Sequence, residues 1–158
     1  MDQAIISLVG NYGEIAQAEI SKLENDFSAG YPCLLQFDLY VRYREQEKLQ
    51  PLRACMQKSV KHFPLSVAAL ASNMAEQTAP NMSVTGRGML LARRAEALDH
   101  DSAAANFAIA QSAFFAGDCE TGVAWGKKAV ALNPLNSRIS GYLGLYMIAC
   151  NLPEGESY

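Results

Sequence analysis

Cysteine and histidine are the residue types in this chain best suited to metal binding, redox chemistry or catalysis, but their spacing favours none of these. The chain has four cysteines without a Cys-x-x-Cys pair: Cys33, Cys55, Cys119 and Cys150. The two histidines, His62 and His100, stand 38 residues apart and lack the spacing of zinc ligands. Because disulfide frameworks are typical of smaller secreted domains, we expect the cysteines to be reduced thiols in the core.

Motifs for phosphate binding or nucleophilic catalysis are missing as well. Gly86-Arg87-Gly88 lacks the further glycines and the Lys-Ser/Thr pair of a phosphate-binding loop. Cys55 and Ser59 have no base at a fixed spacing. Both histidines fall at predicted helix ends, where an imidazolium interacts favourably with the helix dipole. We therefore expect no enzyme activity, no catalytic or metal site and no cofactor.

The composition points to a binding protein of the cytoplasm. Charged residues make up 18% of the 158 residues, against about 25% in an average globular protein, while 50% are hydrophobic. We interpret this shortage of charge as a surface partly covered by a partner or by another part of the protein. The net charge of −3, without a basic run, argues against nucleic-acid contact. No apolar run reaches about 18 residues and the N-terminus lacks a signal-peptide pattern, so we expect no membrane contact and a cytoplasmic location.

The elements that position these residues recur along the chain. Three six-residue stretches begin at Ser59, Ala95 and Ala129, in steps of 36 and 34 residues. Each begins with a small residue and has Pro or His at its sixth position, where a helical pattern stops. A period near 34 residues is typical of solenoids built from helix-turn-helix repeats, which usually provide binding surfaces rather than catalytic sites.

Apolar periodicity predicts the individual helices. The expected ranges are 3–25 (broken by glycines), 33–44, 51–62, 65–79, 83–98, 103–116, 120–132 and 139–150. The predicted domains are an N-terminal helical segment, 1–30, and a repeat region, 31–158, with repeats 33–64, 65–100, 101–134 and a partial one at 135–158. The last helix lacks a partner helix, so we expect either a docked partner or a chain cut from a longer protein.

These features resemble the tetratricopeptide repeat family. The residues that carry the likeness are Ala110, Gly117, Ala129 and Pro134 in the third repeat, Leu143-Gly144 in the fourth, and Leu39, Tyr43 and Pro64 in the first. Asn106 and Asn73 depart from the family's Trp and Leu positions. The resemblance implies an all-α fold: a right-handed α-solenoid of about three helix hairpins with an N-terminal helical segment and an unpaired C-terminal helix.

A narrower resemblance rests on three short sequence segments: Tyr12-Gly13-Glu14-Ile15-Ala16, Tyr31-Pro32-Cys33-Leu34-Leu35 and Leu52-Arg53-Ala54-Cys55-Met56. These segments resemble those of bacterial proteins that join a winged-helix domain, a nucleotide-cyclase domain or a TolB-like segment to C-terminal tetratricopeptide repeats. The likeness implies that the chain is an interior fragment of a multidomain regulator.

By similarity to the family, the first helix of each repeat lines a concave groove. The implied partner-binding residues are Phe37, Val41, Arg44, Phe107, Gln111, Phe114, Phe115, Arg138 and Leu145, with Ala68, Ala71, Ala75 and Gly141 between them. This apolar lining favours an amphipathic helix over an acidic peptide tail. The alternative interpretation, strongest for Phe107 and Phe115, is that the aromatic side chains belong to the core. Replacing Phe114 with a charged residue distinguishes the two interpretations. If Phe114 faces the groove, we expect the substitution to weaken partner binding and leave the melting temperature nearly unchanged.

The sequence therefore predicts a non-catalytic protein-interaction domain of a bacterial regulatory or signalling protein. Its partner would be a peptide, another domain, or the upstream domain of the same protein. Two alternatives remain open: homodimerisation through the apolar helix 139–150, and a small-molecule sensor pocket in the groove.

Overall fold

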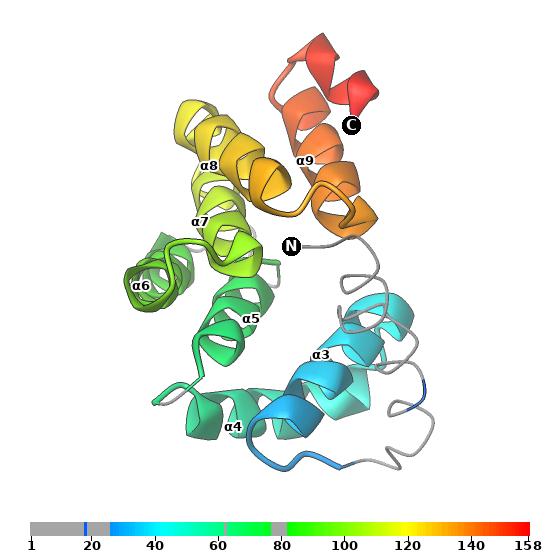
Figure 1. Cartoon of the computed structure of the whole chain (residues 1–158), viewed down its shortest axis with the longest axis vertical. Coiled ribbons are helices and arrows are strands. Elements are labelled where there is room, and N and C mark those ends of the chain that lie inside the picture. Colours follow the sequence, from blue (N-terminus) through cyan, green and yellow to red (C-terminus); the bar gives the residue numbers. More distant parts are fainter. Residues whose placement is uncertain (1–17, 19–25, 62, 77–81) are drawn as a thin grey trace. The chain divides into compact units, whose positions relative to one another are not determined.

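The computed structural model describes residue 18 and residues 26–61, 63–76 and 82–158, with the side chains of 82–85 excepted (Figure 1). Its α-helices are α3 (Tyr31–Tyr43), α4 (Leu49–Ser59), α5 (Pro64–Glu76), α6 (Met82–Leu98), α7 (Ala103–Phe115), α8 (Cys119–Leu132) and α9 (Ser137–Ala149). Two 3-10 helices, η1 (Gln46–Lys48) and η2 (Pro153–Ser157), complete the elements. These described residues contain no strand, which confirms the all-α class for them.

The helix positions follow the local sequence pattern closely. Each helix predicted between residues 33 and 150 has a counterpart whose ends lie within three residues of the predicted ends. Pro64 begins α5, at a position where its missing N–H removes no helical hydrogen bond. Gly117 has φ +82° between α7 and α8, a left-handed conformation that glycine adopts without steric cost. The arrangement of these helices as a curved solenoid stays a prediction.

The chain divides into two compact units, Met1–Ser66 and Val67–Tyr158, with the boundary in the first turn of α5. The predicted N-terminal helix at 3–25, apart from residue 18, lies outside the described residues. So do His62 and residues 77–81, at the junction of the predicted helices 65–79 and 83–98. The division into segments 1–30 and 31–158 therefore stays a prediction.

In the first unit, a disulfide joins Cys33 of α3 to Cys55 of α4, whose Cα atoms lie 6.0 Å apart. A second disulfide, in the other unit, joins Cys119 to Cys150, so the expectation of reduced thiols is wrong for all four cysteines. Their sequence separations of 22 and 31 residues follow no recognisable motif. Pairing depends on how closely two helices bring their Cα atoms, which spacing along the chain does not reveal.

The serine that begins the first six-residue stretch also holds the first unit together. The Ser59 hydroxyl accepts a hydrogen bond from the N–H of Gly30 at 2.8 Å and donates one to the Cys55 carbonyl at 2.9 Å. These two bonds tie the end of α4 to the residue that precedes α3. Around the disulfide, Leu35, Leu52 and Met56 are fully buried.

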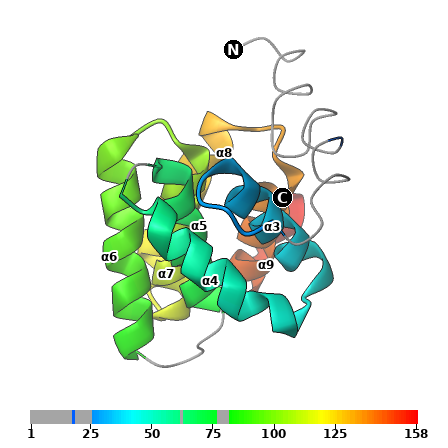
Figure 2. The same ribbon diagram turned by 90° about the horizontal axis from the view of Figure 1, so that it is seen from below.

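In the second unit, successive helices contact one another: α6 with α7, α7 with α8, and α8 with α9 (Figures 1 and 2). One core cluster joins α7, α8 and α9 through Phe107, Ala110, Ala129 and Ile139. Alanine at both Ala110 and Ala129, each fully buried, permits this close helix packing. None of the described helices combines the length and the apolar character that crossing a bilayer requires.

The C-terminal helix has a cover that the sequence did not predict. η2 packs against α9, and the two backbones meet at Gly144 and Gly155. A Cβ on Gly144 would lie 2.6 Å from the Gly155 carbonyl oxygen, which shows how close this approach is. α9 is thus followed by a five-residue 3-10 helix rather than by a partner α-helix, and this short element covers part of the helix predicted to be unpaired. Leu145 and Ile148 stay exposed at 57% and 49%.

Candidate functional site

The residues predicted to face a partner divide between the two units. In the first unit, Phe37 is only 5% exposed, which corrects its assignment to a partner surface. Val41 is half-buried and Arg44 is exposed, with its guanidinium 5.9 Å from the centroid of the Tyr40 ring. Only Val41 and Arg44 of this group therefore have side-chain surface for a partner.

In the second unit, burial separates the predicted residues into core and surface. Phe107 and Gln111 are 7% and 1% exposed, so both are corrected to the core, as the alternative interpretation held for Phe107. Ala68, Ala71 and Ala75 are buried too. Phe114, Phe115 and Arg138 are partly buried, while Gly141 and Leu145 are exposed.

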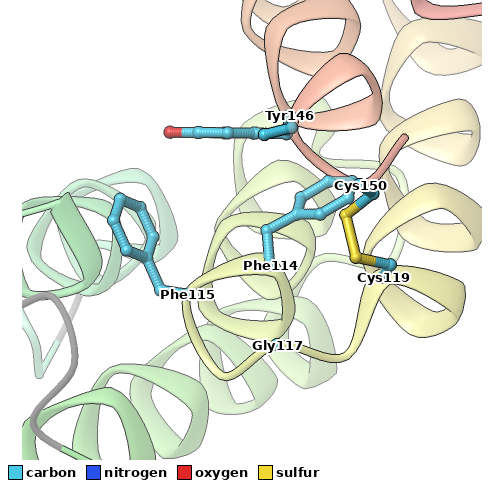
Figure 3. Close-up of a pocket in the computed structure, with 7 residues that line it drawn as sticks. Phe114, Phe115, Gly117, Cys119, Tyr146 and Cys150 are labelled. Atoms are coloured by element: carbon cyan, nitrogen blue, oxygen red, sulfur yellow. A yellow bond between two sulfur atoms is a disulfide. The ribbon is translucent and has the colours of Figure 1, made fainter. Parts of the chain in front are cut away.

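Phe114 and Phe115, at the end of α7, help to line a pocket of about 310 Å³ (Figure 3). The other lining residues are Gly117, Cys119, Tyr146, Ala149 and Cys150. The lining therefore consists of three aromatic rings, a disulfide and small side chains, without a charged group. Figure 3 shows the Cys119–Cys150 bond beside the Phe114 ring, with Phe115 on the other side.

The turn between α7 and α8 brings these residues together. Gly117 reverses the chain, and the Asp118 carboxylate then accepts a hydrogen bond from the Thr121 N–H at 3.0 Å. This N-cap starts α8 at Cys119. Hydrogen bonds from Thr121 also hold the pKa of Asp118 below its ordinary value. A local cap thus fixes one end of the disulfide at the edge of the pocket.

Aromatic side chains of α9 meet those of α7 along the pocket. The Tyr146 ring lies 5.1 Å from that of Phe114 and 5.8 Å from that of Phe115, the latter edge-on. Tyr142 stacks on Tyr146 at 5.9 Å and lies 6.4 Å from Phe107. Pairs at such distances contribute about 0.5–1.5 kcal/mol each beyond the area they bury. They fix the position of Tyr146 in the pocket wall.

A hydrogen-bonded chain behind the rings also holds Tyr146. The Gln111 side-chain amide donates to the Tyr146 hydroxyl oxygen at 2.9 Å and to a Glu76 carboxylate oxygen at 3.1 Å. Gln111 is buried, so its bonds are protected from competing water. The predicted binding residue Gln111 thus supports the pocket rather than lining it.

Phe114 also packs against α8. A Cβ on Gly122 would lie 2.7 Å from the Phe114 ring, and this ring packs on the Phe107 cluster. A charge at Phe114 would have to be buried in these contacts, at a cost in stability. We therefore now expect that substitution to lower the melting temperature, contrary to the expectation from the sequence.

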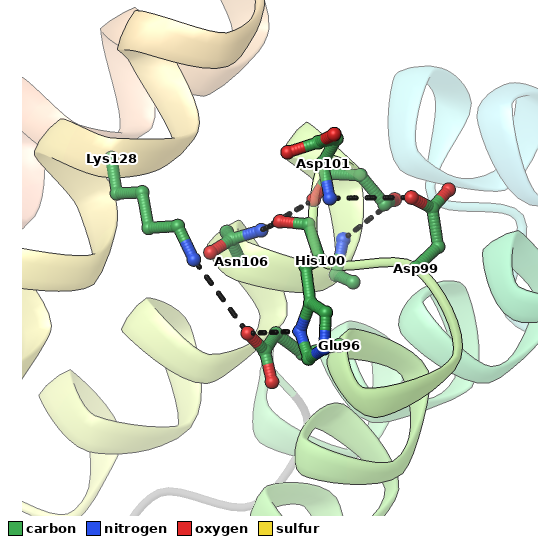
Figure 4. Close-up of polar contacts among 8 residues, drawn as sticks. Glu96, Asp99, His100, Asp101, Asn106 and Lys128 are labelled. Atoms are coloured by element: carbon green, nitrogen blue, oxygen red, sulfur yellow. Dashed lines mark hydrogen bonds and ion pairs between the residues drawn. The ribbon is translucent and has the colours of Figure 1, made fainter.

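His100 has a partner more specific than the helix dipole. Its Nδ1 lies 2.9 Å from Glu96 Oε1, and the Lys128 ammonium of α8 lies 3.6 Å from the same oxygen (Figure 4). The hydrogen bond with His100 and the neighbouring positive charge of Lys128 hold the pKa of Glu96 below its ordinary value. Lys128 and Arg93 also lie 4.8 and 4.7 Å from the centroid of the Trp125 ring. This group connects α6 to α8 and is a packing contact.

Asn106 closes the turn between α6 and α7. Its side-chain amide donates to the carbonyl oxygens of His100 at 3.0 Å and Ser102 at 2.8 Å (Figure 4). The side chain is fully buried. These two hydrogen bonds tie α7 to the turn that precedes it.

Sequence reasoning missed Tyr142, Tyr146 and Cys150 as members of the site. They are spaced four residues apart, as successive residues on one helix face are. The prediction selected Gly141 and Leu145, one position away, which are exposed in the structure. An error of one residue in helix register moves the selected face by about 100°.

The lining of the pocket is therefore apolar and suited to contact with an apolar group. Within the described parts of the chain, no three His, Cys, Asp or Glu side chains are grouped to hold a metal ion. No family model, curated protein or solved structure matches this chain.

Proposed function

We propose that this chain is a non-catalytic protein-interaction module of the helical-repeat type, which seats an apolar side chain of a peptide partner between α7 and α9. The main support for this proposal is the pocket of about 310 Å³, whose wall includes Phe114, Phe115 and Tyr146. Its lining offers no charged group, which favours an aliphatic or aromatic side chain over an acidic one. The tetratricopeptide resemblance supports a peptide as the source of that side chain.

The same resemblance supports a place in a bacterial regulatory or signalling protein, with a separate domain as one source of the peptide. The cytoplasmic location expected from the sequence is harder to combine with two disulfides. Stable disulfides are rare in the cytosol, where those that occur are usually transient. A cytoplasmic role would therefore require disulfides that respond to the redox state of the cell.

The test begins with selection of a random peptide library on the immobilised, oxidised chain. We expect enriched peptides to share an aliphatic or aromatic residue, and one of them becomes the probe for fluorescence polarisation. Ala149→Leu fills the pocket and keeps a good helix former at an exposed position. We expect it to weaken peptide binding at least tenfold, which is about 1.4 kcal/mol.

The matched control is Ala97→Leu, at an exposed position of α6 that does not line the pocket. It should bind the peptide as the parent chain does. Equal affinity of the Ala149→Leu and Ala97→Leu variants would show that the peptide binds elsewhere, and failure to enrich any peptide would count against the proposed function.

A small ligand is a second candidate for the same pocket, because its volume reaches the lower end of the range for small-molecule sites, about 300 Å³. Native mass spectrometry of the purified chain distinguishes this case. A bound mass that is lost in Ala149→Leu would favour the ligand over the peptide.

Self-association is favoured by a different observation, the exposure of Leu145 and Ile148 on α9. Light scattering over a hundredfold concentration range tests it. A dimer that dissociates in Leu145→Glu would support this function, and a monomer throughout would remove it.

A further inference from the structure

The disulfide between Cys119 and Cys150 occupies an unusual place, because it is part of the pocket wall. It joins the first residue of α8 to the residue that follows α9, with Cα atoms 6.1 Å apart. Phe114, Tyr146 and Ala149 line the same pocket. A change at this bond therefore acts directly on the surface that a partner would contact.

The two disulfides differ in their access to reagents. Cys33 and Cys55 are 0% and 2% exposed, whereas Cys119 and Cys150 are both partly exposed. Reduction proceeds by attack of a thiolate on a disulfide sulfur, so its rate depends on access to that sulfur. A thiol reductant should therefore reach the Cys119–Cys150 bond first.

The fold around this bond does not depend on it alone. α8 has the Asp118 cap, and α9 has a cap in which the Asn136 side chain accepts from the Ile139 N–H at 3.2 Å. The aromatic contacts of Tyr146 and the packing of η2 also hold α9. After reduction the helices should persist, while the two sulfurs move beyond bonding distance and the pocket wall shifts.

From this position, exposure and support, we propose that Cys119–Cys150 is a redox switch of the pocket. The oxidised disulfide holds the pocket wall in its binding shape, and reduction by a dithiol loosens the wall. A thiolate of the dithiol attacks one sulfur and releases the other cysteine as a thiolate. The second thiol of the reductant then displaces the first cysteine and closes the reductant's own disulfide. The pair takes up two electrons and two protons, and the dithiol loses the same number.

This inference rests on the proposed function for its binding readout, so its test includes two readouts without a partner. The chain is titrated with dithiothreitol, the free thiols are alkylated, and peptide mapping identifies which cysteines were released. Aromatic NMR signals of Tyr146 follow the pocket, and circular dichroism follows helix content. The library-selected peptide reports binding in each redox state.

We expect Cys119 and Cys150 to be alkylated at reductant concentrations that leave Cys33 and Cys55 protected. The Tyr146 signals should shift, helix content should be retained, and peptide affinity should fall at least tenfold. Cys119→Ser with Cys150→Ser should bind like the reduced chain in both conditions. Cys33→Ala with Cys55→Ala should keep the response of Tyr146 to reductant.

Three results would overturn the switch: reduction of Cys33–Cys55 first, reduction of Cys119–Cys150 without a change in the Tyr146 signals and peptide affinity, or loss of the second unit's helices on reduction. Failure of the proposed function has a different signature. In that case no peptide binds in either state, while the reduction order and the Tyr146 shift still decide whether the pocket responds to the disulfide.

Discussion

The α3–α4 pair and the α8–α9 pair each contain a disulfide, yet they are held together by different means. At the starts of α3 and α4 no side chain accepts a capping hydrogen bond, and their disulfide is buried. The starts of α7, α8 and α9 are capped by Ser102, Asp118 and Asn136. Their disulfide lies in a pocket wall, partly exposed.

The difference shows that the same covalent bond can have two roles in one chain. In the first unit, the disulfide belongs to the core and joins two helices whose starts have no side-chain cap. In the second unit, caps and aromatic contacts already position the helices, which leaves the disulfide free to change state. We therefore interpret Cys33–Cys55 as a structural disulfide and Cys119–Cys150 as the regulatory disulfide proposed above.

Removing the buried disulfide should have the largest effect. We expect Cys33→Ala with Cys55→Ala to cost the first unit about 3 kcal/mol of unfolding free energy from the lost cross-link, which closes a separation of 22 residues. Loss of buried side-chain packing adds to this cost. Hydrogen-exchange mass spectrometry of α3 and α4 peptides measures the change.

The matching variant, Cys119→Ala with Cys150→Ala, loses a cross-link of similar entropy but little buried surface. Its effect on α8 and α9 should be smaller. If the second pair of substitutions destabilises its helices as much as the first, the division of roles between the disulfides is wrong.

The contact between α9 and η2 provides a second test, of intermediate size. Gly144→Ala would place a methyl group against the Gly155 carbonyl oxygen, in backbone that cannot rotate away. We expect a loss of about 1–3 kcal/mol in urea denaturation. Gly141→Ala, on the same helix with open space around its Cβ, should instead gain about 0.5–1 kcal/mol. Equal effects of both variants would mean that η2 does not pack on α9 in solution.

The cap of α8 should have the smallest effect, and one that depends on pH. Asp118→Ala removes the acceptor of the Thr121 N–H and should lower the melting temperature at pH 7, whereas Asp118→Asn keeps an acceptor and should lower it less. Because the pKa of Asp118 is depressed in the folded chain, its carboxylate stabilises above its ordinary pKa, near 4. This contribution is lost as the pH falls through the depressed value.

Melting curves of the parent chain and Asp118→Asn between pH 7 and pH 2 check this sign. The difference between them should shrink below about pH 4. A difference that stays constant over the whole range would show that the charge of Asp118 does not stabilise the cap.

The sequence by itself determined where the helices lie. Apolar periodicity, Pro64 and Gly117 act within a few residues of their own positions, so their meaning can be read without the fold. The candidate surface residues came from the family resemblance instead. Of that set, Phe114 and Phe115 line a pocket, whereas Phe107 and Gln111 are buried.

Only the tertiary structure decided which side chains share a site. Phe107 and Phe115 lie on one helix, but the first is covered by the cluster with Ile139 and the second is left at the pocket. Cys119 and Cys150 are brought together by the packing of α8 on α9, across 31 residues of sequence. Contacts of this kind depend on the register between helices, and a local pattern carries no information on that register.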